Sequence, residues 1–534
     1  MVVRVGSSSP AASAASLGIP DIFNAATYFV DRNVRDGLGA KVAIECGSER
    51  ITYGQVLECV NRFGSALRRC LEVRAEERVV LLLIDGPAFA YSFFGAMKIG
   101  AVPIPINTLW KAADYRYVLN DSRARVLVVS DVLLPRILEI PKSELPYLQN
   151  IVVVGDAPAG TQSFADLLGA GLAELTAEPT TRDDVAFWLY SSGSTGSPKG
   201  CVHLHHDMVV CTELYAGPTL GISNADRFFS VAKLFFAYGL GNGLYFPFAV
   251  GATTILWPGP PTAANVFSVI ERCRPTLVFS VPTNYAMLLA HPHEGEGDFD
   301  LSTVRYAVSA GEALPPSIFE RFRQRFGVDI LDGIGSTEIL HIFISNRPGA
   351  IRPGSSGLLV PGYEATLVDE HKQSVAQGEI GNLLVKGDSI CSCYWNQHDK
   401  TRDTIEGHWI RTGDKYSQDA DGFFWYAGRS DDMLKVGGVW VSPVEVEAAL
   451  IEHPAVQECA VVAHEDQDTL IKPFAYVVVK QGATGTADLA RELQQFVKSK
   501  LAEYKRPRGI EFLSELPKTA TGKIQRFKLR ERNP

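Results

Sequence analysis

The sequence predicts an α/β protein with two layered units, a short β-rich stretch and a small α+β unit at the C-terminus. From Ile51 to about Pro348, apolar runs of strand length alternate with helical patterns, which is typical of mostly parallel sheets. Between residues 351 and 426 the chain changes to short strands rich in glycine and proline. A chain of 534 residues is also too long for one hydrophobic core.

The first layered unit is expected to begin with a helix over residues 52–69. Thr52 is a suitable cap, and Val56, Val60, Phe63 and Leu67 fall on one face. Further along the chain, the pattern predicts a helix over residues 88–99 and strands over residues 79–84, 102–106 and 126–129.

The second layered unit is expected to contain strands over residues 253–257, 277–281, 305–309 and 328–331. A glycine-containing, charged segment at residues 428–432 predicts a boundary between an N-terminal domain, 1–431, and a C-terminal domain, 432–534. In the second of these the pattern predicts helices from Ser442 to near His453 and over residues 487–501, with strands over residues 458–463 and 473–479.

Composition excludes some classes of protein. The net charge of −9 gives no global basic field for nucleic acid. Nine cysteines without C-x-x-C spacing indicate reduced thiols and a cytoplasmic location. Residues 1–17 are small and rich in Ser and Ala, so we expect a disordered lead-in and not a signal peptide. The most apolar region, 79–106, is interrupted by Asp85, Pro87 and Lys98, so no membrane span is expected.

A loop over residues 190–200 follows an apolar run and has the composition of a polyphosphate cradle. Glycines allow backbone N–H groups to approach an anion, hydroxyls donate hydrogen bonds, and Lys199 adds charge. The Walker pattern does not fit, because Pro198 precedes the lysine and Gly200 follows it. A flexible Ser/Gly linker is the alternative reading of this composition.

This loop resembles the signature loop of the adenylate-forming superfamily, which contains acyl-CoA synthetases, luciferases and adenylation domains. The resemblance implies the fold of that superfamily, with a large N-terminal domain and a small mobile C-terminal domain. It also implies that the loop contacts ATP through Ser191, Ser192, Gly193, Ser194, Thr195, Gly196 and Lys199.

A second matching motif follows the strand predicted at residues 328–331. The resemblance makes Glu338 a catalytic Mg²⁺ ligand and Thr337 a catalytic phosphate contact, and a carboxylate is a ligand that Mg²⁺ accepts. The resemblance also implies that ATP or AMP is contacted by Ala310, Gly311, Glu312, Asp332, Gly333 and Ile334, the first three of them in the segment that meets adenine. Ile334 replaces the aromatic residue that the superfamily has there, which leaves the stacking partner of adenine open. Taken alone, the motif is also compatible with an ordinary glycine-rich turn.

Asp414 is expected on a tight turn, and the resemblance implies that its carboxylate accepts hydrogen bonds from the two ribose hydroxyls of ATP. Arg429, near the predicted boundary, suits ribose or phosphate. Either residue alone is also compatible with a surface ion pair.

In the C-terminal domain the resemblance identifies Lys523 as the catalytic lysine and Asp431 as the hinge. It places Gly437 and Gly438 beside the pantetheine arm of coenzyme A, and Tyr504, Arg506 and Arg508 at its nucleotide. A solvated basic tail is the alternative reading for Lys523.

The acyl pocket of the superfamily matches Phe236, Ala237, Tyr238, Gly335 and His341. Aromatic walls with small residues suit a flat ring, and the absence of an aspartate here argues against amino acids. The resemblance therefore implies a ligase that uses ATP, Mg²⁺ and coenzyme A to activate an aromatic acid, with benzoate preferred.

Two alternatives stay open at this stage: an enzyme that loads an aryl-carrier protein, and a catalytically silent nucleotide-binding protein. Neither nucleic acid nor membrane is an expected partner, and the sequence leaves open whether the chain forms a homodimer.

Overall fold

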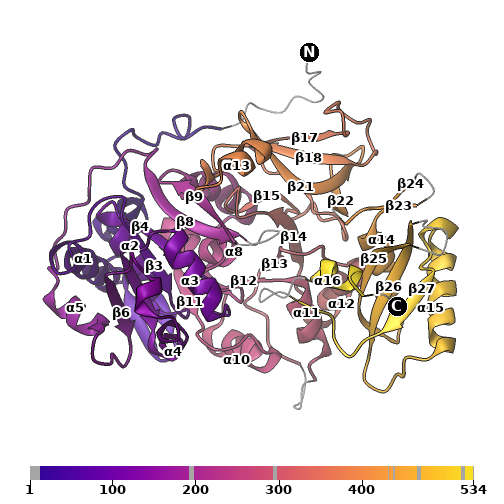
Figure 1. The fold of residues 1–534 in the computed structure, drawn as a ribbon, viewed down its shortest axis with the longest axis horizontal. Coiled ribbons are helices and arrows are strands. Elements are labelled where there is room, and N and C mark those ends of the chain that lie inside the picture. Colours follow the sequence, from indigo (N-terminus) through magenta and orange to yellow (C-terminus); the bar gives the residue numbers. More distant parts are fainter. Residues whose placement is uncertain are drawn as a thin grey trace.

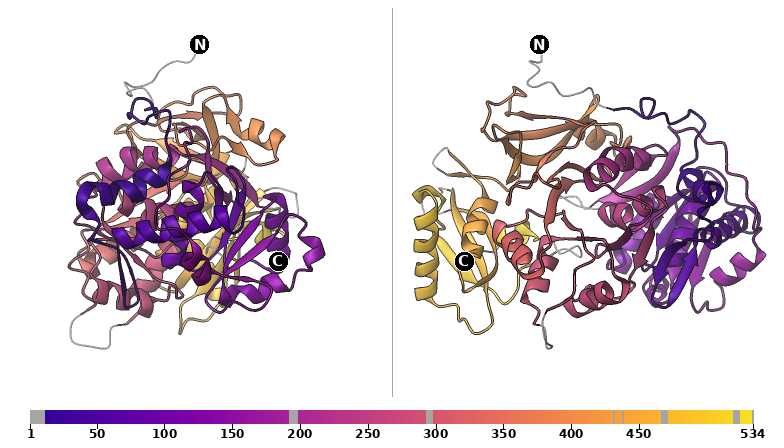
Figure 2. Two further views of the ribbon diagram at one scale, coloured as in Figure 1. Left: turned by 90° about the vertical axis from the view of Figure 1, so that its left-hand side faces the viewer. Right: turned by 180° about the vertical axis from the view of Figure 1, so that it is seen from behind.

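The computed structural model describes residues 12–191, 198–292, 298–430, 432–436, 439–465, 471–518 and 524–532. Its elements form two large sheets with helices, a β-rich unit and a small α+β unit at the C-terminus (Figure 1). The predicted α/β class is confirmed. Seen from behind, the C-terminal unit lies at the opposite end of the molecule from the first layered unit (Figure 2).

The first layered unit has a five-stranded sheet in the order β4-β3-β5-β6-β7, and all its pairs are parallel. Its strands are β3 (Arg78–Leu82), β4 (Val102–Pro105), β5 (Val126–Ser130), β6 (Asn150–Val154) and β7 (Gln162–Ser163). The helices are α1 (Tyr53–Arg69), α2 (Pro87–Lys98), α3 (Ala112–Asp121), α4 (Leu134–Leu138) and α5 (Phe164–Ala170).

Helix α1 begins as its sequence predicts. Thr52 Oγ1 accepts a hydrogen bond from the Gln55 backbone N–H at 3.3 Å, and Gln55 Oε1 accepts from the Thr52 N–H at 2.9 Å. This reciprocal cap satisfies two N–H groups that a helix start otherwise leaves unpaired. The four residues predicted for its apolar face are all fully buried.

The second layered unit has a nine-stranded sheet in the order β16-β15-β14-β13-β12-β10-β11-β1-β2. Its strands are β1 (Val42–Cys46), β2 (Glu49–Thr52), β10 (Arg227–Ser230), β11 (Thr253–Leu256), β12 (Leu277–Ser280), β13 (Tyr306–Ser309), β14 (Ile330–Gly335), β15 (Ile342–Ser345) and β16 (Leu358–Leu359). The helices are α6 (Asp207–Cys211), α7 (Gly217–Leu220), α8 (Ala237–Leu240), α9 (Phe246–Ala249), α10 (Ala263–Cys273), α11 (Pro282–Ala290) and α12 (Pro316–Phe326). Strands β1 and β10 to β14 run parallel to their neighbours in this group, whereas β2, β15 and β16 form antiparallel edges.

A small antiparallel sheet, in the order β19-β9-β8, contains the two ends of the predicted phosphate loop. It consists of β8 (Val185–Ser191), β9 (Lys199–Leu204) and β19 (Cys393–Tyr394). Ser191 pairs with Lys199 across β8 and β9, so the loop joins the strands of a hairpin.

The β-rich unit contains β17 (Glu364–Val368), β18 (Gly381–Lys386), β20 (Ile405–Glu406), β21 (Trp409–Gln418), β22 (Phe424–Arg429) and helix α13 (His398–Thr404). The C-terminal unit contains β23 (Leu434–Val436), β24 (Val439–Val441), α14 (Pro443–Ile451), β25 (Val456–Glu465), β26 (Ile471–Val479), α15 (Ala487–Lys500), β27 (Gly509–Phe512) and α16 (Arg526–Arg530). The predicted change to short strands after residue 351 and the predicted α+β unit at the C-terminus are both present in the structure. The domain division at residue 431 stays a prediction.

The predicted disordered lead-in is wrong for residues 12–17. Ala14 is buried, its backbone N–H donates to a carboxylate oxygen of Asp388, and the Ala12 N–H donates to the Gly362 carbonyl at 2.9 Å. The small side chains that suggested disorder allow this segment to pack closely against the rest of the fold.

Candidate functional site

Glu338 lies where three segments of the chain meet, just after β14. Its Oε1 accepts hydrogen bonds from Ser191 Oγ at 3.2 Å and from the Tyr394 hydroxyl at 2.9 Å. Lys199 Nζ is 4.0 Å from the same oxygen and 4.4 Å from the centre of the Tyr394 ring. Burial and the Glu338 carboxylate both raise the pKa of Tyr394, so its hydroxyl keeps its proton and donates. The carboxylate is therefore held beside a cation.

The predicted phosphate loop connects two residues of this cluster, Ser191 and Lys199. Its central residues Ser192, Gly193, Ser194, Thr195 and Gly196 lie outside the described residues. The two ends that are described both face Glu338. This geometry brings the first and second predicted ATP motifs together.

The other residues predicted to bind ATP or AMP in this region follow the C-terminal end of β13 or lie in β14. Ala310 is buried, Gly311 has a φ of +92°, and Glu312 Oε2 accepts a hydrogen bond from Thr283 Oγ1 at 2.8 Å. The strand expected to end at residue 331 continues to Gly335, so Gly333 and Ile334 lie in β14 and pair with β15. Gly333 to Gly335 therefore form part of a strand and not of a glycine-rich turn, because pairing with the antiparallel edge strand extends β14.

Asp332 is a buried carboxyl group within the same strand. Burial raises its pKa to about 8. The group is consequently protonated near neutral pH and can donate a hydrogen bond.

Asp414 pairs with Arg429, the other residue predicted at the ribose. Arg429 Nη1 donates to Asp414 Oδ1 at 3.1 Å and to the Thr412 carbonyl at 3.1 Å. The expected tight turn is wrong, because Asp414 lies within β21 and pairs directly with Arg429 of β22. Gly413, the glycine before Asp414, has a φ of +77°, a conformation that is common in turns but occurs here within a strand.

His341 forms the centre of an aromatic cluster at the predicted acyl pocket. Its ring centre lies 4.5 Å from that of Phe246, 5.4 Å from that of Tyr215 and 5.7 Å from that of Tyr238. Burial lowers the pKa of His341 to about 3, so the imidazole is neutral at physiological pH.

The other predicted pocket residues lie around this cluster. Phe236 and Ala237 lie at the start of α8, and the Tyr238 hydroxyl donates to the Val308 carbonyl at 3.0 Å. At Gly335 a Cβ atom would lie 2.7 Å from the main-chain carbon and oxygen of His341. Only glycine fits there without moving the histidine, so Gly335 and His341 are directly coupled.

Three of the five residues predicted to contact coenzyme A are described, and all three lie in the C-terminal unit. Tyr504 is exposed, whereas Arg506 and Arg508 both bind Glu503, with shortest distances of 2.8 Å and 3.3 Å. Gly437, Gly438, the hinge residue Asp431 and the catalytic lysine Lys523 lie outside the described residues.

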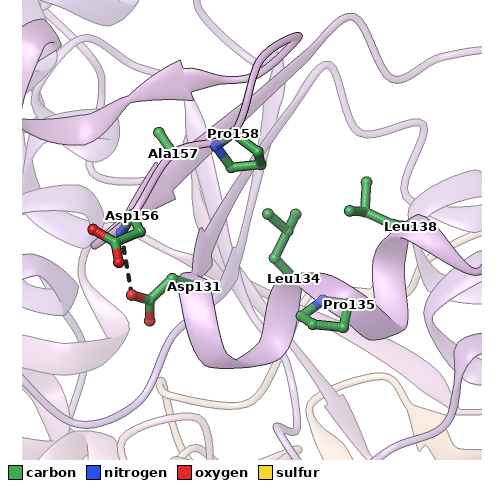
Figure 3. A pocket seen from close by; sticks show the side chains of 7 residues that line it. All are labelled: Asp131, Leu134, Pro135, Leu138, Asp156, Ala157 and Pro158. Atoms are coloured by element: carbon green, nitrogen blue, oxygen red, sulfur yellow. Dashed lines mark hydrogen bonds between the residues drawn. The ribbon is translucent and has the colours of Figure 1, made fainter.

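A surface pocket occurs elsewhere, on the first layered unit (Figure 3). The pocket is lined by Asp131, by Leu134, Pro135 and Leu138 of α4, and by residues 156–158 after β6. The Asp156 N–H donates a hydrogen bond to Asp131 Oδ2 at 3.1 Å. None of the predicted site residues lines it, so it is separate from the Glu338 cluster.

Tyr394 and His203 are residues of the site that sequence reasoning misses. Tyr394 reaches Glu338 only because the two-residue strand β19 pairs with β9, nearly two hundred residues earlier in the chain. His203 contacts the backbone of Thr337. The sequence could have indicated His203, because a residue four positions after Lys199 in a strand lies on the same face as Lys199.

Known protein families match most of this chain. The AMP-binding enzyme family matches residues 30–395, and the AMP-binding enzyme C-terminal domain matches residues 445–523. The chain belongs to the AMP-binding enzyme family. The family match spans Ser191, Lys199, Glu338 and Tyr394, which form the cluster described above.

Two curated relatives of this family member are similar along nearly the whole chain. A benzoate–CoA ligase of Thauera aromatica is 51% identical over 517 residues, covering 96% of this chain and 97% of the relative. A 4-hydroxybenzoate–CoA/benzoate–CoA ligase of Rhodopseudomonas palustris is 46% identical, covering 95% and 94%.

Solved structures confirm the adenylate-forming fold. An anthranilate CoA ligase in complex with anthranoyl-AMP has a TM-score of 0.92 at 47% identity, covering 96% of this chain and 98% of its own. A benzoate CoA ligase from Burkholderia xenovorans has a TM-score of 0.87 at 46% identity, covering 95% and 100%.

Two kinds of feature are absent from the described residues. No helix there is both long and apolar enough to cross a membrane. The same residues contain no group of three or more His, Cys, Asp or Glu side chains placed to hold a metal ion.

Proposed function

We propose that the chain is an AMP-forming benzoate–CoA ligase, which converts benzoate, ATP and coenzyme A into benzoyl-CoA, AMP and pyrophosphate. The observation that carries this proposal is the 51% identity to a benzoate–CoA ligase over 96% of the chain. The neutral aromatic cluster around His341 supports an apolar ring as the acyl group.

The chemistry requires activation, because a carboxylate does not react with a thiol while its leaving group would be oxide. Attack of the benzoate oxygen on the α-phosphorus of ATP forms benzoyl-AMP and expels pyrophosphate. Negative charge on the phosphate oxygens must be met by groups placed in advance. Lys199 is one such cation, and Lys523 is proposed as another. In the second step the thiolate of coenzyme A attacks the acyl carbonyl, and AMP leaves.

The residues around Glu338 fit Mg²⁺. Mg²⁺ prefers oxygen ligands and is commonly held by one or two carboxylates together with substrate phosphates, and the Glu338 carboxylate lies beside the ends of the predicted phosphate loop. Glu338 would hold the ion, which supplies positive charge to the phosphates. Asp414, held by Arg429, would accept hydrogen bonds from ribose.

A cytoplasmic location suits the nine cysteines, all of which are free. Whether the chain forms a homodimer is a question that analytical ultracentrifugation can answer.

The test is release of AMP by the purified chain with ATP, Mg²⁺ and coenzyme A, measured across a panel of acids. We expect benzoate and its fluoro and amino analogues to give the highest kcat/KM, and octanoate and amino acids to give little product. Faster turnover of octanoate or of an amino acid than of benzoate would overturn the proposed substrate. Replacing coenzyme A by an aryl-carrier protein tests the alternative acceptor.

A further inference from the structure

His203 is a buried histidine that the proposed chemistry does not use. It lies in β9, on the same face as Lys199, and its ring stacks on that of Phe187 with the centres 5.2 Å apart. Asp207, the first residue of α6, is also fully buried. A buried polar pair of this kind requires partners for its polar atoms.

Both ring nitrogens of His203 face oxygen atoms. Nδ1 is 2.7 Å from Asp207 Oδ2, and Nε2 is 2.8 Å from the backbone carbonyl oxygen of Thr337. A carbonyl oxygen only accepts, so Nε2 must donate. Nδ1 contacts Asp207 Oδ2, an oxygen that also accepts from the Leu204 N–H at 3.1 Å. Asp207 thus orients the ring, and the ring holds the Thr337 carbonyl.

The segment held in this way has a strained backbone. The Thr337 carbonyl also accepts from the Leu340 N–H at 3.2 Å, and Leu340 has a φ of +72°, a conformation that is unfavourable for a leucine. Such a turn persists only where its surroundings fix it. His203 supplies a fixed donor at its first residue.

Glu338 follows Thr337 directly and is fixed on its other side as well. Its backbone carbonyl accepts from the Cys391 N–H at 2.7 Å, while its carboxylate accepts from Ser191 and Tyr394. Strand β9 therefore acts on this segment twice, through Lys199 near the carboxylate and through His203 at the preceding carbonyl.

We propose that His203, oriented by Asp207, is a positioning residue that sets the Thr337–Glu338 segment for the adenylation step. This inference rests on the proposed function of the site. It assigns His203 no contact with substrate, so its loss should impair the step in which Glu338 acts and should spare the thioester step.

Two substitutions separate the two hydrogen bonds of the ring. His203→Gln places an amide N–H near the position of Nε2 and keeps the donor to Thr337, whereas His203→Asn places it near Nδ1 and keeps only the contact with Asp207. Adenylation is measured as benzoate-dependent exchange of pyrophosphate into ATP, and the second step as benzoyl-CoA formation from supplied benzoyl-AMP.

We expect His203→Asn to lower kcat for adenylation about tenfold or more, because the part-buried Thr337 carbonyl loses the imidazole donor and keeps only the Leu340 N–H. The KM for benzoate and the rate of the second step should change less than about threefold, and His203→Gln should recover most of the adenylation rate. Equal losses in both variants, or parallel losses in both steps, would overturn the proposal and leave His203 with a structural role.

Asp207→Ala provides a second test if His203→Asn does not fold. Selective loss of adenylation in that variant supports the positioning role, and loss of both steps together overturns it. The wild-type panel is measured first. If another acid is the better substrate, the proposed substrate fails, and the variants are compared with that acid, so the two inferences fail separately.

Discussion

Glu338 takes its position from residues that lie far from it in the sequence. Ser191 and Lys199 belong to a motif whose composition already indicates phosphate, and these two and Glu338 could be predicted from the sequence. Tyr394 could not, because a two-residue strand has no periodicity and its pairing with β9 is a long-range event. His203 contacts a backbone atom, and nothing in a side-chain pattern indicates which carbonyl needs a donor.

Because of Asp332, we expect the free energy of unfolding to depend on pH. Its pKa is about 8 in the folded chain, far above the ordinary value for an aspartate. Between about pH 4 and pH 8 the folded state therefore binds a proton that the unfolded state lacks, and the free energy of unfolding falls as pH rises through this window. The contribution is on the order of a few kcal/mol.

Asp332→Asn removes this titration. We expect the melting temperature of the variant relative to wild type to be higher at pH 8 than at pH 5, measured by thermal denaturation. Asp226→Asn is the matched control: burial raises the Asp226 pKa, but Arg305 and Thr276 outweigh it and hold that pKa below its ordinary value. Its relative melting temperature should therefore fall from pH 3 to pH 6. An Asp332→Asn difference that does not change with pH contradicts the assignment.

At the scale of elements, the sequence predicts the interiors of helices and strands better than their pairing. The predicted strand at residues 253–257 corresponds to β11, and the predicted helix at 487–501 to α15. Strand β14 continues beyond its expected end because β15 pairs with Gly333, Ile334 and Gly335. The spacing of apolar residues predicts which positions of one segment are buried, but it does not predict which other strand pairs with that segment.

Gly335→Ala should disturb the junction of β14 and β15. The added Cβ atom would lie 2.7 Å from main-chain atoms of His341 and 2.9 Å from the Ile342 nitrogen, so a strand has to move. Overpacking of this kind costs about 1–3 kcal/mol. We expect a lower melting temperature and a higher KM for benzoate, measured by thermal denaturation and by initial rates.

Gly169→Ala is a suitable control for that substitution. Gly169 lies in α5, and a Cβ atom added there meets nothing within 4 Å. Alanine favours a helix over glycine, so stability should stay equal or rise slightly. An unchanged KM for benzoate in both variants would show that Gly335 does not shape the acyl pocket.

At the scale of the whole molecule, the proposed role of Lys523 predicts that the two half-reactions separate. Lys523→Ala should slow formation of benzoyl-AMP by about a hundred- to a thousandfold, the usual loss for a preorganised donor, and should leave conversion of supplied benzoyl-AMP near the wild-type rate. Lys518→Ala is the control, because Lys518 binds Glu458 at 2.5 Å on β25. Similar small effects in both variants would instead support a solvated basic tail.

The pairing of β1 with β11 has a consequence for how the chain is made. Ile44 lies beside Thr254, about 210 positions later in the sequence, and the hairpin partner β2 is the only neighbour of β1 synthesised early among the strands described. At about 5–20 residues per second, a ribosome takes roughly 10–40 s to reach that partner. During this interval one edge of β1, with Ala43 and Ile44, lacks its partner strand, so we expect this edge to be open to pairing with other chains.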